Sequence, residues 1–282
     1  MKYLGMRPGQ LPLDEQVACL RAALDLNRTL GEVLIRAAAM NLPGWYLVAG
    51  CLYQTVWNVI TGQAPEAGIL DYDLVYFDPS DLSWEAEDAV IRAGDEIFAG
   101  LAAPVQIRNQ ARVHLWYEQK FGPPCPPHAS SEAAIDTYEA TVACLGVRLE
   151  PGGRCRVYAP YGLSDVFNLV IRPNPVLATR DVYETKTARW QGQWPGLTVL
   201  PWRVLTAIAG RAAVCQTMMS APPAAAGGFG RPGPGAARSG STLRRRGCPP
   251  GRRSARRGAA PGLSTASSSA RPSRRRAVFP LA

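Results

Sequence analysis

The sequence predicts an α+β domain over residues 1–202, followed by a tail over residues 203–282 that we expect to be disordered. In the first part, short apolar runs of strand length alternate with segments of helical periodicity. That part holds 16 Lys and Arg against 22 Asp and Glu, a net charge of −6. The second part holds 15 Arg and no acidic residue, and its apolar periodicity is lost. The two parts therefore need separate physical descriptions.

Local signals place the elements of the predicted domain. Thr29 and Glu32 have the spacing of a capping box, which predicts a helix start there. Pro43 and Gly44 end that helix. The expected helices cover 14–40 (two helices), 51–61, 83–100, 110–121, 130–139, 162–169 and 181–193, and the expected strands cover 45–50, 69–77, 104–109, 142–149 and 155–159.

Two aspartates stand out in GILDYDLVYFD, residues 68–78. Asp71 and Asp73 are two apart in a predicted strand, so their side chains point to the same side with Cα atoms about 6.6 Å apart. Two carboxylates at this spacing can hold hard divalent cations, Mg²⁺ or Mn²⁺, which in turn bind substrate phosphates. With no cation nearby, the two charges would repel and one carboxyl would tend to protonate. The alternative is a DxD that only caps a turn at the strand end.

Gly50 adds a second feature upstream of the aspartates. It ends the predicted strand 45–50 and opens the predicted helix 51–61. A helix N-terminus reached through glycine offers backbone N–H groups and the positive end of the helix dipole to a phosphate. A plain tight turn is the alternative explanation for the glycine. A phosphate site and a carboxylate pair in adjacent elements together indicate phosphoryl-transfer chemistry.

Four blocks of the sequence resemble the bacterial nucleotidyltransferase-like proteins, which are members of the DNA polymerase beta superfamily. The blocks are WYLVAGCLYQTVWN, DYDLVYFDPSDLSWEAEDAVI, IRNQARVHLWYEQKFG and VYAPYGLSDVFNLVIRPNP. The resemblance runs from about Leu13 to Trp202 and covers none of the tail. It implies a nucleotidyltransferase-like fold, with a small mixed β-sheet flanked by helices. It also implies Mg-dependent transfer of a nucleotidyl group from an NTP to an acceptor.

The resemblance also implies roles for particular residues. The superfamily's helix start after glycine corresponds to Gly50 and Cys51, and its D-x-D to Asp71 and Asp73. Its third carboxylate lies on a later neighbouring strand, where this chain has Gln106. A glutamine amide offers a metal one neutral oxygen but no charge and no base, and Cys51 replaces a small or hydroxyl residue that would help to hold phosphate. A second hypothesis is therefore a nucleotide-binding protein of the same fold with weak or absent catalysis.

Other polar residues are candidates for the same site. Arg112 could bind phosphate through its planar guanidinium, or form a salt bridge with one of the domain's many acids. Arg172 is a further phosphate candidate, and His114 is expected to be structural rather than a base. Asp78 and Asp81 are expected to cap the helix that follows them. We expect four tryptophans to lie in the core: Trp45, Trp57, Trp84 and Trp116.

The tail is rich in Arg, Ala, Gly, Pro and Ser. One hypothesis is nonspecific, salt-sensitive nucleic-acid binding through phosphate contacts. The favoured alternatives are a solvated disordered segment and a frameshift or read-through product, because these five residue types have GC-rich codons and the family-like pattern stops at Trp202.

Bulk properties narrow the classes of function. The seven cysteines form no CxxC and no cluster with His114 and His128, so we expect neither a disulfide framework nor a zinc site. We expect no secretory signal at the N-terminus. The most apolar run, residues 45–60, is too short and too polar to span a membrane. These features predict a cytosolic protein. The resemblance implies that its partners are an NTP and an unidentified acceptor.

Overall fold

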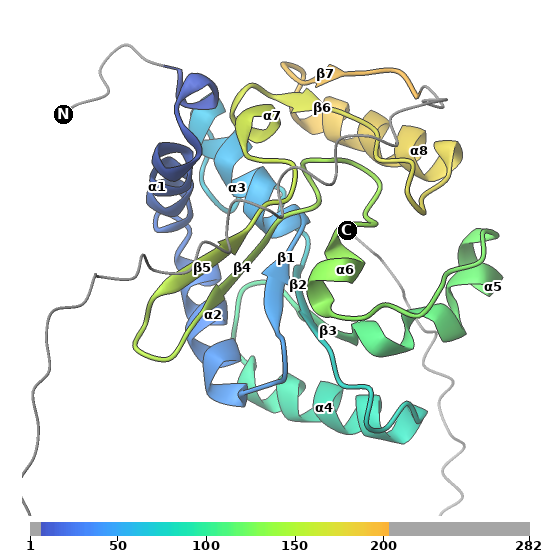
Figure 1. Ribbon diagram of the computed structural model, residues 1–282. Coiled ribbons are helices and arrows are strands. Elements are labelled where there is room, and N and C mark those ends of the chain that lie inside the picture. The colour runs from blue at the N-terminus through green and yellow to red at the C-terminus, as the bar shows by residue number, and fades with distance from the viewer. Residues whose placement is uncertain (1–6, 203–282) are drawn as a thin grey trace, which may run out of the picture. The chain divides into compact units, whose positions relative to one another are not determined.

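The centre of the fold is a five-stranded sheet in the order β3-β2-β1-β4-β5 (Figure 1). The computed structural model describes residues 7–202, so the predicted tail lies outside the described residues. β2 and β3 run parallel and the other neighbouring strands antiparallel, which confirms the predicted mixed sheet. The strands are β1 (Tyr46–Val48), β2 (Tyr72–Tyr76), β3 (Val105–Asn109), β4 (Gly146–Leu149) and β5 (Cys155–Tyr158).

Helices flank this sheet, and the α+β class is confirmed (Figure 1). They are α1 (Leu13–Leu24), α2 (Arg28–Met40), α3 (Gly50–Thr61), α4 (Trp84–Ile97), α5 (Tyr117–Phe121), α6 (Ser131–Ile135), α7 (Ser164–Phe167) and α8 (Arg180–Gln193). Short 3-10 helices are η1 (Pro8–Gln10) and η2 (Gln110–Leu115), and β6 (Val170–Ile171) pairs with β7 (Thr198–Val199) in a second, parallel sheet. α2 packs against β2 and β4, α3 against β1 and β2, and α4 against β3. Within residues 7–202, no helix is long and apolar enough to cross a membrane.

The start of α2 differs from the prediction. The side chain of Asn27 accepts a hydrogen bond from the Leu30 backbone N–H at 2.9 Å, so Asn27 caps the helix instead of the Thr29–Glu32 pair. The Asn27 amide also donates to the Thr55 hydroxyl at 2.8 Å. This buried bond joins α2 to α3, and it explains why the helix begins two residues earlier than the capping-box spacing indicates.

The turn before α4 also differs in detail from the prediction. Ser83, and neither Asp78 nor Asp81, caps α4, because its hydroxyl accepts from the Ala86 N–H at 3.2 Å. Asp81 accepts from the Ser83 N–H at 2.8 Å, and Asp78 accepts from the Ser80 N–H at 2.9 Å. The two aspartates therefore shape the turn that leads to the cap.

The predicted helix 110–121 is two short pieces, η2 and α5. Asn109 caps η2 by accepting from the Ala111 N–H at 3.1 Å. At Trp116 the backbone leaves the helical region, with φ −131°, and α5 starts after it. Trp116 at the break, with Tyr117 and Phe121 of α5, lines a cavity that is described below.

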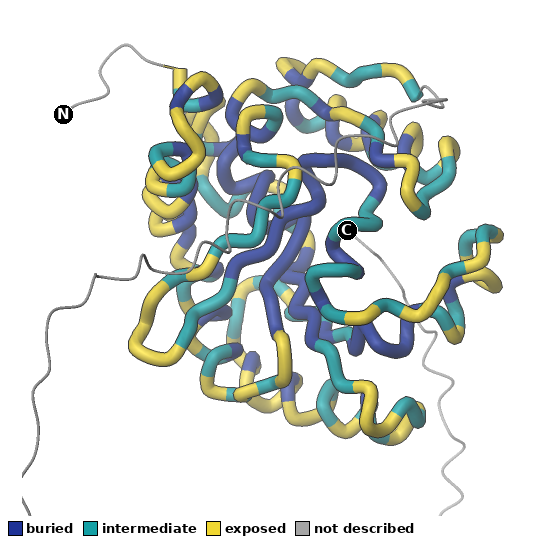
Figure 2. The backbone as a smooth tube through the Cα atoms, viewed as in Figure 1, coloured by how far each residue is buried: buried dark blue, intermediate teal, exposed yellow. Residues whose placement is uncertain are grey.

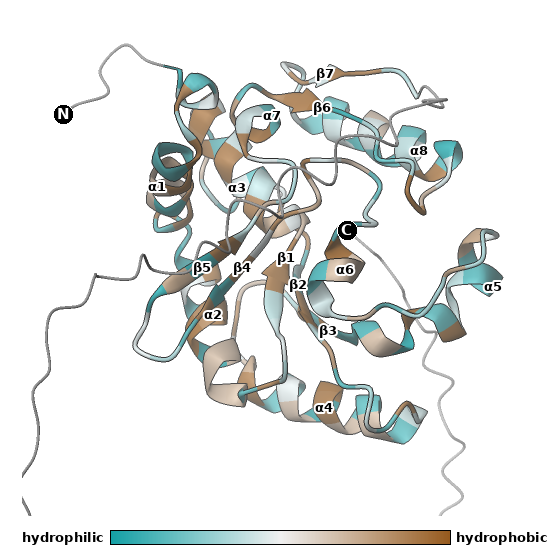
Figure 3. Cartoon of the chain, viewed as in Figure 1, coloured by the Kyte–Doolittle hydropathy of each residue, from teal (hydrophilic) through white to brown (hydrophobic). Residues whose placement is uncertain are grey.

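β1 and β2 lie at the centre of the core. Every residue of both strands is buried (Figure 2), and hydrophobic residues dominate them (Figure 3). A strand covered on both faces reads as a nearly continuous apolar run. Asp73 breaks this pattern in β2, where it is a carboxylate with only 8% of its surface exposed. A buried charge of this kind needs a partner or a function.

An aromatic cluster joins α8 to α3. It consists of Tyr53 and Trp57 on α3 with Trp190 and Trp194 at the end of α8, and the Trp57 and Trp194 ring centroids are 5.3 Å apart. The Trp194 indole donates to the Asn58 side-chain oxygen at 2.9 Å, deep in the core. These contacts fix α8 against α3, and α8 carries Lys186 and Arg189, two cations that are considered below.

Two of the four tryptophans predicted to be core residues are buried. Trp45 and Trp57 are buried as predicted and Trp116 is half-buried. Trp84 is 55% exposed, so its prediction was wrong. It is the first residue of α4, where its ring lies 5.6 Å from the Arg112 guanidinium. A ring stacked on a cation at the surface keeps one face in water.

Candidate active site

Asp71 and Asp73 lie at the start of β2, in the middle of the sheet. Asp73 pairs with Val48 on β1 and with Gln106 on β3. Asp71 directly precedes β2, which begins at Tyr72 and is shorter than the predicted strand. Both aspartates are more than nine-tenths buried. The register therefore brings two carboxylates and one amide together across two parallel strands.

Gln106 lies where the resemblance places the third carboxylate. Its amide nitrogen donates to the Asp71 carboxylate at 2.5 Å. Among residues 7–202, no group of three or more His, Cys, Asp and Glu side chains could hold a metal ion. The donor set at this point is thus two carboxylates and one amide, all oxygen ligands of the hard type that Mg²⁺ prefers.

The aspartate pair is electrostatically strained without a cation. Burial and, after it, the neighbouring Asp71 charge raise the pKa of Asp73 to about 7, although Lys186 and Arg108 oppose the shift. Burial also raises the pKa of Asp71, and Arg189, Lys186 and the Gln106 amide oppose that shift. A divalent cation between the two carboxylates would remove this repulsion, so the residues present fit a metal.

α3 begins at Gly50, as predicted, next to the aspartates. Ala49 directly before it has φ 55° and ψ −122°, a conformation that favours glycine. The first N–H groups of α3 have no intrahelical carbonyl to bind. Gly50 and Cys51 line a cavity of about 270 Å³ together with Asp71 and Arg189.

The Cys51 thiol itself faces the core. Its sulfur lies 3.5 Å from the Val48 carbonyl oxygen, and only 1% of the residue is exposed. Burial and the nearby Asp73 raise the pKa of the thiol well above its usual range. The thiol of Cys51 is therefore not available to a phosphate.

A second cavity, of about 170 Å³, is lined by Asp73. Its cations are Arg108 from β3, Lys120 from α5 and Lys186 from α8, and Glu139 is its second carboxylate. Lys186 donates to Glu139 at 3.0 Å. Its aromatic side chains include Trp116, Tyr117, Phe121 and Tyr138. We call this the aromatic cavity.

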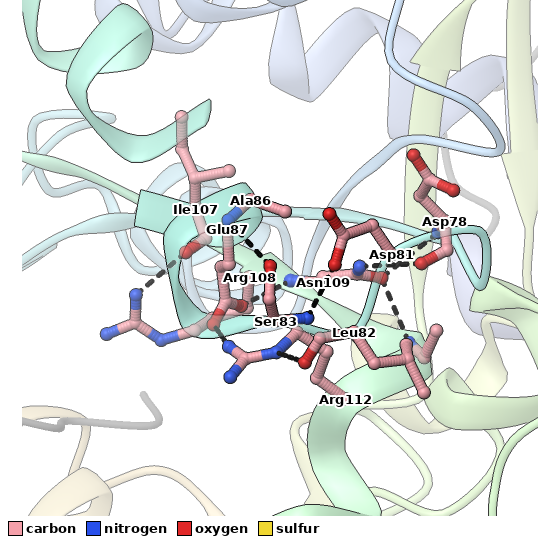
Figure 4. Close-up of polar contacts among 11 residues, drawn as sticks. Asp78, Asp81, Leu82, Ser83, Ala86, Glu87, Ile107, Arg108, Asn109 and Arg112 are labelled. Carbon is pink, nitrogen blue, oxygen red and sulfur yellow. Dashed lines mark hydrogen bonds and ion pairs between the residues drawn. The ribbon is translucent and has the colours of Figure 1, made fainter. Parts of the chain in front are cut away.

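Arg112 does not reach the aspartates. Its guanidinium forms an ion pair with the buried Glu87 and donates to the Leu82 carbonyl at 3.0 Å (Figure 4). Only 8% of the Arg112 side chain is exposed. Arg112 therefore forms a salt bridge, as the alternative prediction stated, and the predicted binding of phosphate by Arg112 is corrected.

This ion pair belongs to a network that holds the end of β3 (Figure 4). Glu87 also accepts from the Asn109 backbone N–H at 2.8 Å. The Asn109 side chain accepts from the Asp78 N–H at 3.0 Å and donates to the Asp78 carbonyl at 2.8 Å. The network links α4 to the end of β3, the strand that carries Gln106 and Arg108.

Two other candidates lie outside the site. The Arg172 guanidinium pairs with Asp165 at 3.0 Å and is half exposed. The His114 Nδ1 atom is buried and has no hydrogen-bond partner. Neither residue lines the cavities that contain the aspartates.

Four charged residues of the site were missed in the sequence. Lys186 and Arg189 occur in a strongly polar helix, and Lys120 and Glu139 in short segments, so nothing local sets them apart from ordinary surface charges. Lys186 and Arg189 are three apart on α8, which places both on one helix face. That spacing is the one signal that could have grouped them.

A mixed sheet with two adjacent aspartates beside a helix N-terminus defines the nucleotidyltransferase class. The chain belongs to the nucleotidyltransferase family, whose model matches residues 35–199. A structure solved by NMR and described as revealing a CCA-adding enzyme head domain superimposes with a TM-score of 0.54. It is 22% identical and aligns with 69% of this chain and 100% of that one, a likeness that concerns the fold. No curated protein matches the chain. Family and fold together support nucleotidyl transfer.

Proposed function

We propose that the protein transfers a nucleotidyl group from an NTP to a hydroxyl acceptor with Mg²⁺, or Mn²⁺, as cofactor. The observation that carries this proposal is the pair Asp71 and Asp73, buried side by side between two cavities with cations on both sides. Asp71 and Asp73 would hold the metal, with the Gln106 oxygen as a neutral ligand after the amide turns. The metal supplies charge neutralisation of the phosphates.

The protein's own groups would orient the triphosphate. The backbone N–H groups of Gly50 and Cys51 and the Arg189 guanidinium meet phosphate in one cavity, and Arg108, Lys120 and Lys186 meet it in the other. The acceptor oxygen attacks the α-phosphorus and forms a new P–O bond. The bond to the leaving pyrophosphate then breaks, and the pyrophosphate departs with its electron pair.

Glu139 is our candidate for the general base that takes the proton of the acceptor hydroxyl. It is the carboxylate that shares the aromatic cavity with Asp73, and Lys186 holds it at 3.0 Å. Gln106 cannot accept a proton at neutral pH, and the two aspartates would be occupied by metal. A general base must lie within reach of the attacking hydroxyl, and Glu139 lines the same cavity as Asp73.

Calorimetry on the full chain tests the proposal. We expect Mg-dependent binding of at least one of the four NTPs, and at least a tenfold loss of affinity in Asp71→Asn. Asp95→Asn, which removes an exposed carboxylate of α4, is the matched control and should bind like wild type. Absence of binding by all four NTPs would overturn the proposal.

The second candidate is a nucleotide-binding protein of this fold with weak or absent catalysis. The Gln106 amide favours it, because it donates to Asp71 at 2.5 Å and brings no third negative charge. Pyrophosphate release separates the two candidates. A protein that binds Mg–NTP yet releases none with a panel of hydroxyl acceptors is the non-catalytic form.

The tail hypotheses remain predictions, since residues 203–282 lie outside the described residues. The domain boundary at Trp202 remains a prediction as well. Nonspecific nucleic-acid binding through the tail predicts an affinity for mixed DNA or RNA that falls steeply with salt. Truncation after Trp202 should abolish it. We also propose a cytosolic location, which agrees with the free cysteines among the described residues.

A further inference from the structure

We propose that the aromatic cavity binds the nucleobase of the NTP and holds it by ring packing. This inference rests on the proposed function and adds a binding subsite to it. Three features of the cavity support it: the arrangement of its rings, its size and its charge.

The rings form one wall of the cavity. Tyr117 and Phe121 have centroids 4.7 Å apart, and the Trp116 ring lies 6.2 Å from Tyr117 and 6.5 Å from Phe121. They come from α5 and the residue before it, across the cavity from Val182 of α8. Side chains of this kind form the surfaces on which nucleobases stack.

The size of the cavity matches one planar ring system. Its volume is about 170 Å³. A buried apolar cavity of about 150 Å³ is enough to take up benzene. The aromatic cavity therefore has room for a base.

The charges of the cavity favour a ligand with a polyanion attached to its ring. Arg108, Lys120 and Lys186 face two carboxylates, Asp73 and Glu139, in one cavity. All three cations line the one cavity, and burial followed by the Arg108 and Lys186 charges lowers the pKa of Lys120. Lys120 also lies 4.9 Å from the Phe121 ring centre. The cations thus connect the rings to the aspartates, as the triphosphate connects a base to the metal.

The cavity also contains polar side chains that could contact the edge of a base. Gln110, His128 and Tyr138 line it together with the rings. The Thr137 hydroxyl donates to the Ala134 carbonyl at 2.7 Å, so its proton is already used. Stacking on the rings does not depend on which base is bound, because every base has a π-face.

The test compares Phe121→Leu with wild type in the full chain. Leucine keeps the wall apolar and removes the ring, and Tyr161→Ala, which removes an exposed ring outside the cavity, is the control. Loss of one stacked ring should weaken Mg–ATP binding by roughly 5- to 150-fold, from about 1–3 kcal/mol per stacked base. Binding of Mg–tripolyphosphate, which has no base, should not change.

Two outcomes would overturn the inference and leave the proposed function standing. One is wild-type affinity for Mg–ATP in Phe121→Leu while Asp71→Asn abolishes binding, which would place the base elsewhere and leave the cavity to the acceptor. The other is an equal loss of Mg–ATP and Mg–tripolyphosphate, which would indicate general damage.

Adenosine tests the cavity without the metal chemistry. We expect it to bind weakly, without Mg²⁺, equally well in Asp71→Asn and wild type, and several-fold less well in Phe121→Leu. If adenosine binds in this way while no NTP shows Mg-dependent binding, the proposed function fails and the ring site stands. No adenosine binding at millimolar concentration would remove the ring site.

Discussion

The Gln106 amide nitrogen donates to the Asp71 carboxylate at 2.5 Å, and this bond joins β3 to the start of β2. The amide thereby stabilises the charged form of a buried carboxylate in the absence of metal. A third carboxylate at this position would instead need a cation to be tolerated. The metal-free fold is thus more stable with glutamine at position 106 than it would be with an acidic residue there.

Gln106→Glu should reverse that balance. In the metal-free protein at pH 8 we expect a lower melting temperature, because three carboxylates would share a buried site. In the presence of Mg²⁺ we expect tighter metal binding than in wild type. Calorimetric Mg²⁺ titrations and thermal melts with and without the metal measure both effects. Unchanged Mg²⁺ affinity would show that position 106 is not the third ligand position.

Asp73→Asn should stabilise the metal-free protein at high pH only. The pKa of Asp73 is about 7 in the fold, above the roughly 3.9 of an unfolded aspartate. The native state therefore binds more protons between these values, and stability falls as pH rises from about 4 to 7. The variant lacks that loss, so its melting temperature should exceed that of wild type at pH 8 and match it at pH 4.

Mg²⁺ should invert the comparison of melting temperatures between Asp73→Asn and wild type. At pH 8 the metal should raise the melting temperature of wild type and leave Asp73→Asn unchanged, because ligand binding to the native state stabilises it. Asp95→Asn serves as the control in both series. An equal response of the variant and wild type to Mg²⁺ would contradict a role of Asp73 as ligand.

Arg112→Met should destabilise the fold without a direct effect on nucleotide binding. It leaves the Glu87 carboxylate buried without its cation, which costs roughly 3–5 kcal/mol. The control is Arg92→Met, which breaks the exposed Arg92–Asp88 pair of α4 and should cost less than about 1 kcal/mol. Urea unfolding measures both. A large loss of NTP affinity in fully folded Arg112→Met would restore the phosphate role.

Ala49→Gly should stabilise the protein. Alanine at φ 55° and ψ −122° is strained by about 1–3 kcal/mol, which exceeds the roughly 0.4–1 kcal/mol that a glycine costs through the unfolded chain. Ala39→Gly, on the exposed face of α2, should instead destabilise by about 0.5–1 kcal/mol. Thermal melts compare the two. A lower melting temperature for Ala49→Gly would mean that the strain is absent.

Local sequence patterns predicted the centre of the site. Gly50, Asp71 and Asp73 each lie in or beside a short element with a clear signal, whereas Gln106 was indicated only by the family resemblance. Parallel pairing of β2 and β3 brings Asp71, Asp73 and Gln106 together. The prediction failed where partners distant in the chain decide. Asn27 outcompetes Thr29 as the cap of α2 because Thr55, on another helix, binds its amide.

The cations of α8 could not be predicted for the same reason. Lys186 and Arg189 lie more than 100 residues from Asp71, and their helix is positioned by the contact of Trp190 and Trp194 with α3. Aromatic packing of this kind has no fixed sequence spacing. The chemistry of the site was therefore readable in its strands, and its electrostatics only in the assembled core.

The packing of α8 on α3 has a consequence for the order of events during synthesis. Because a nascent chain emerges from its N-terminus, the aspartates and the helix beside them leave the ribosome more than 100 residues before Trp194. Until then Asp71 and Asp73 have neither Arg189 nor Lys186 beside them. The nascent protein can thus build its five-stranded sheet early, and the proposed nucleotide site would be complete only when α8 has docked.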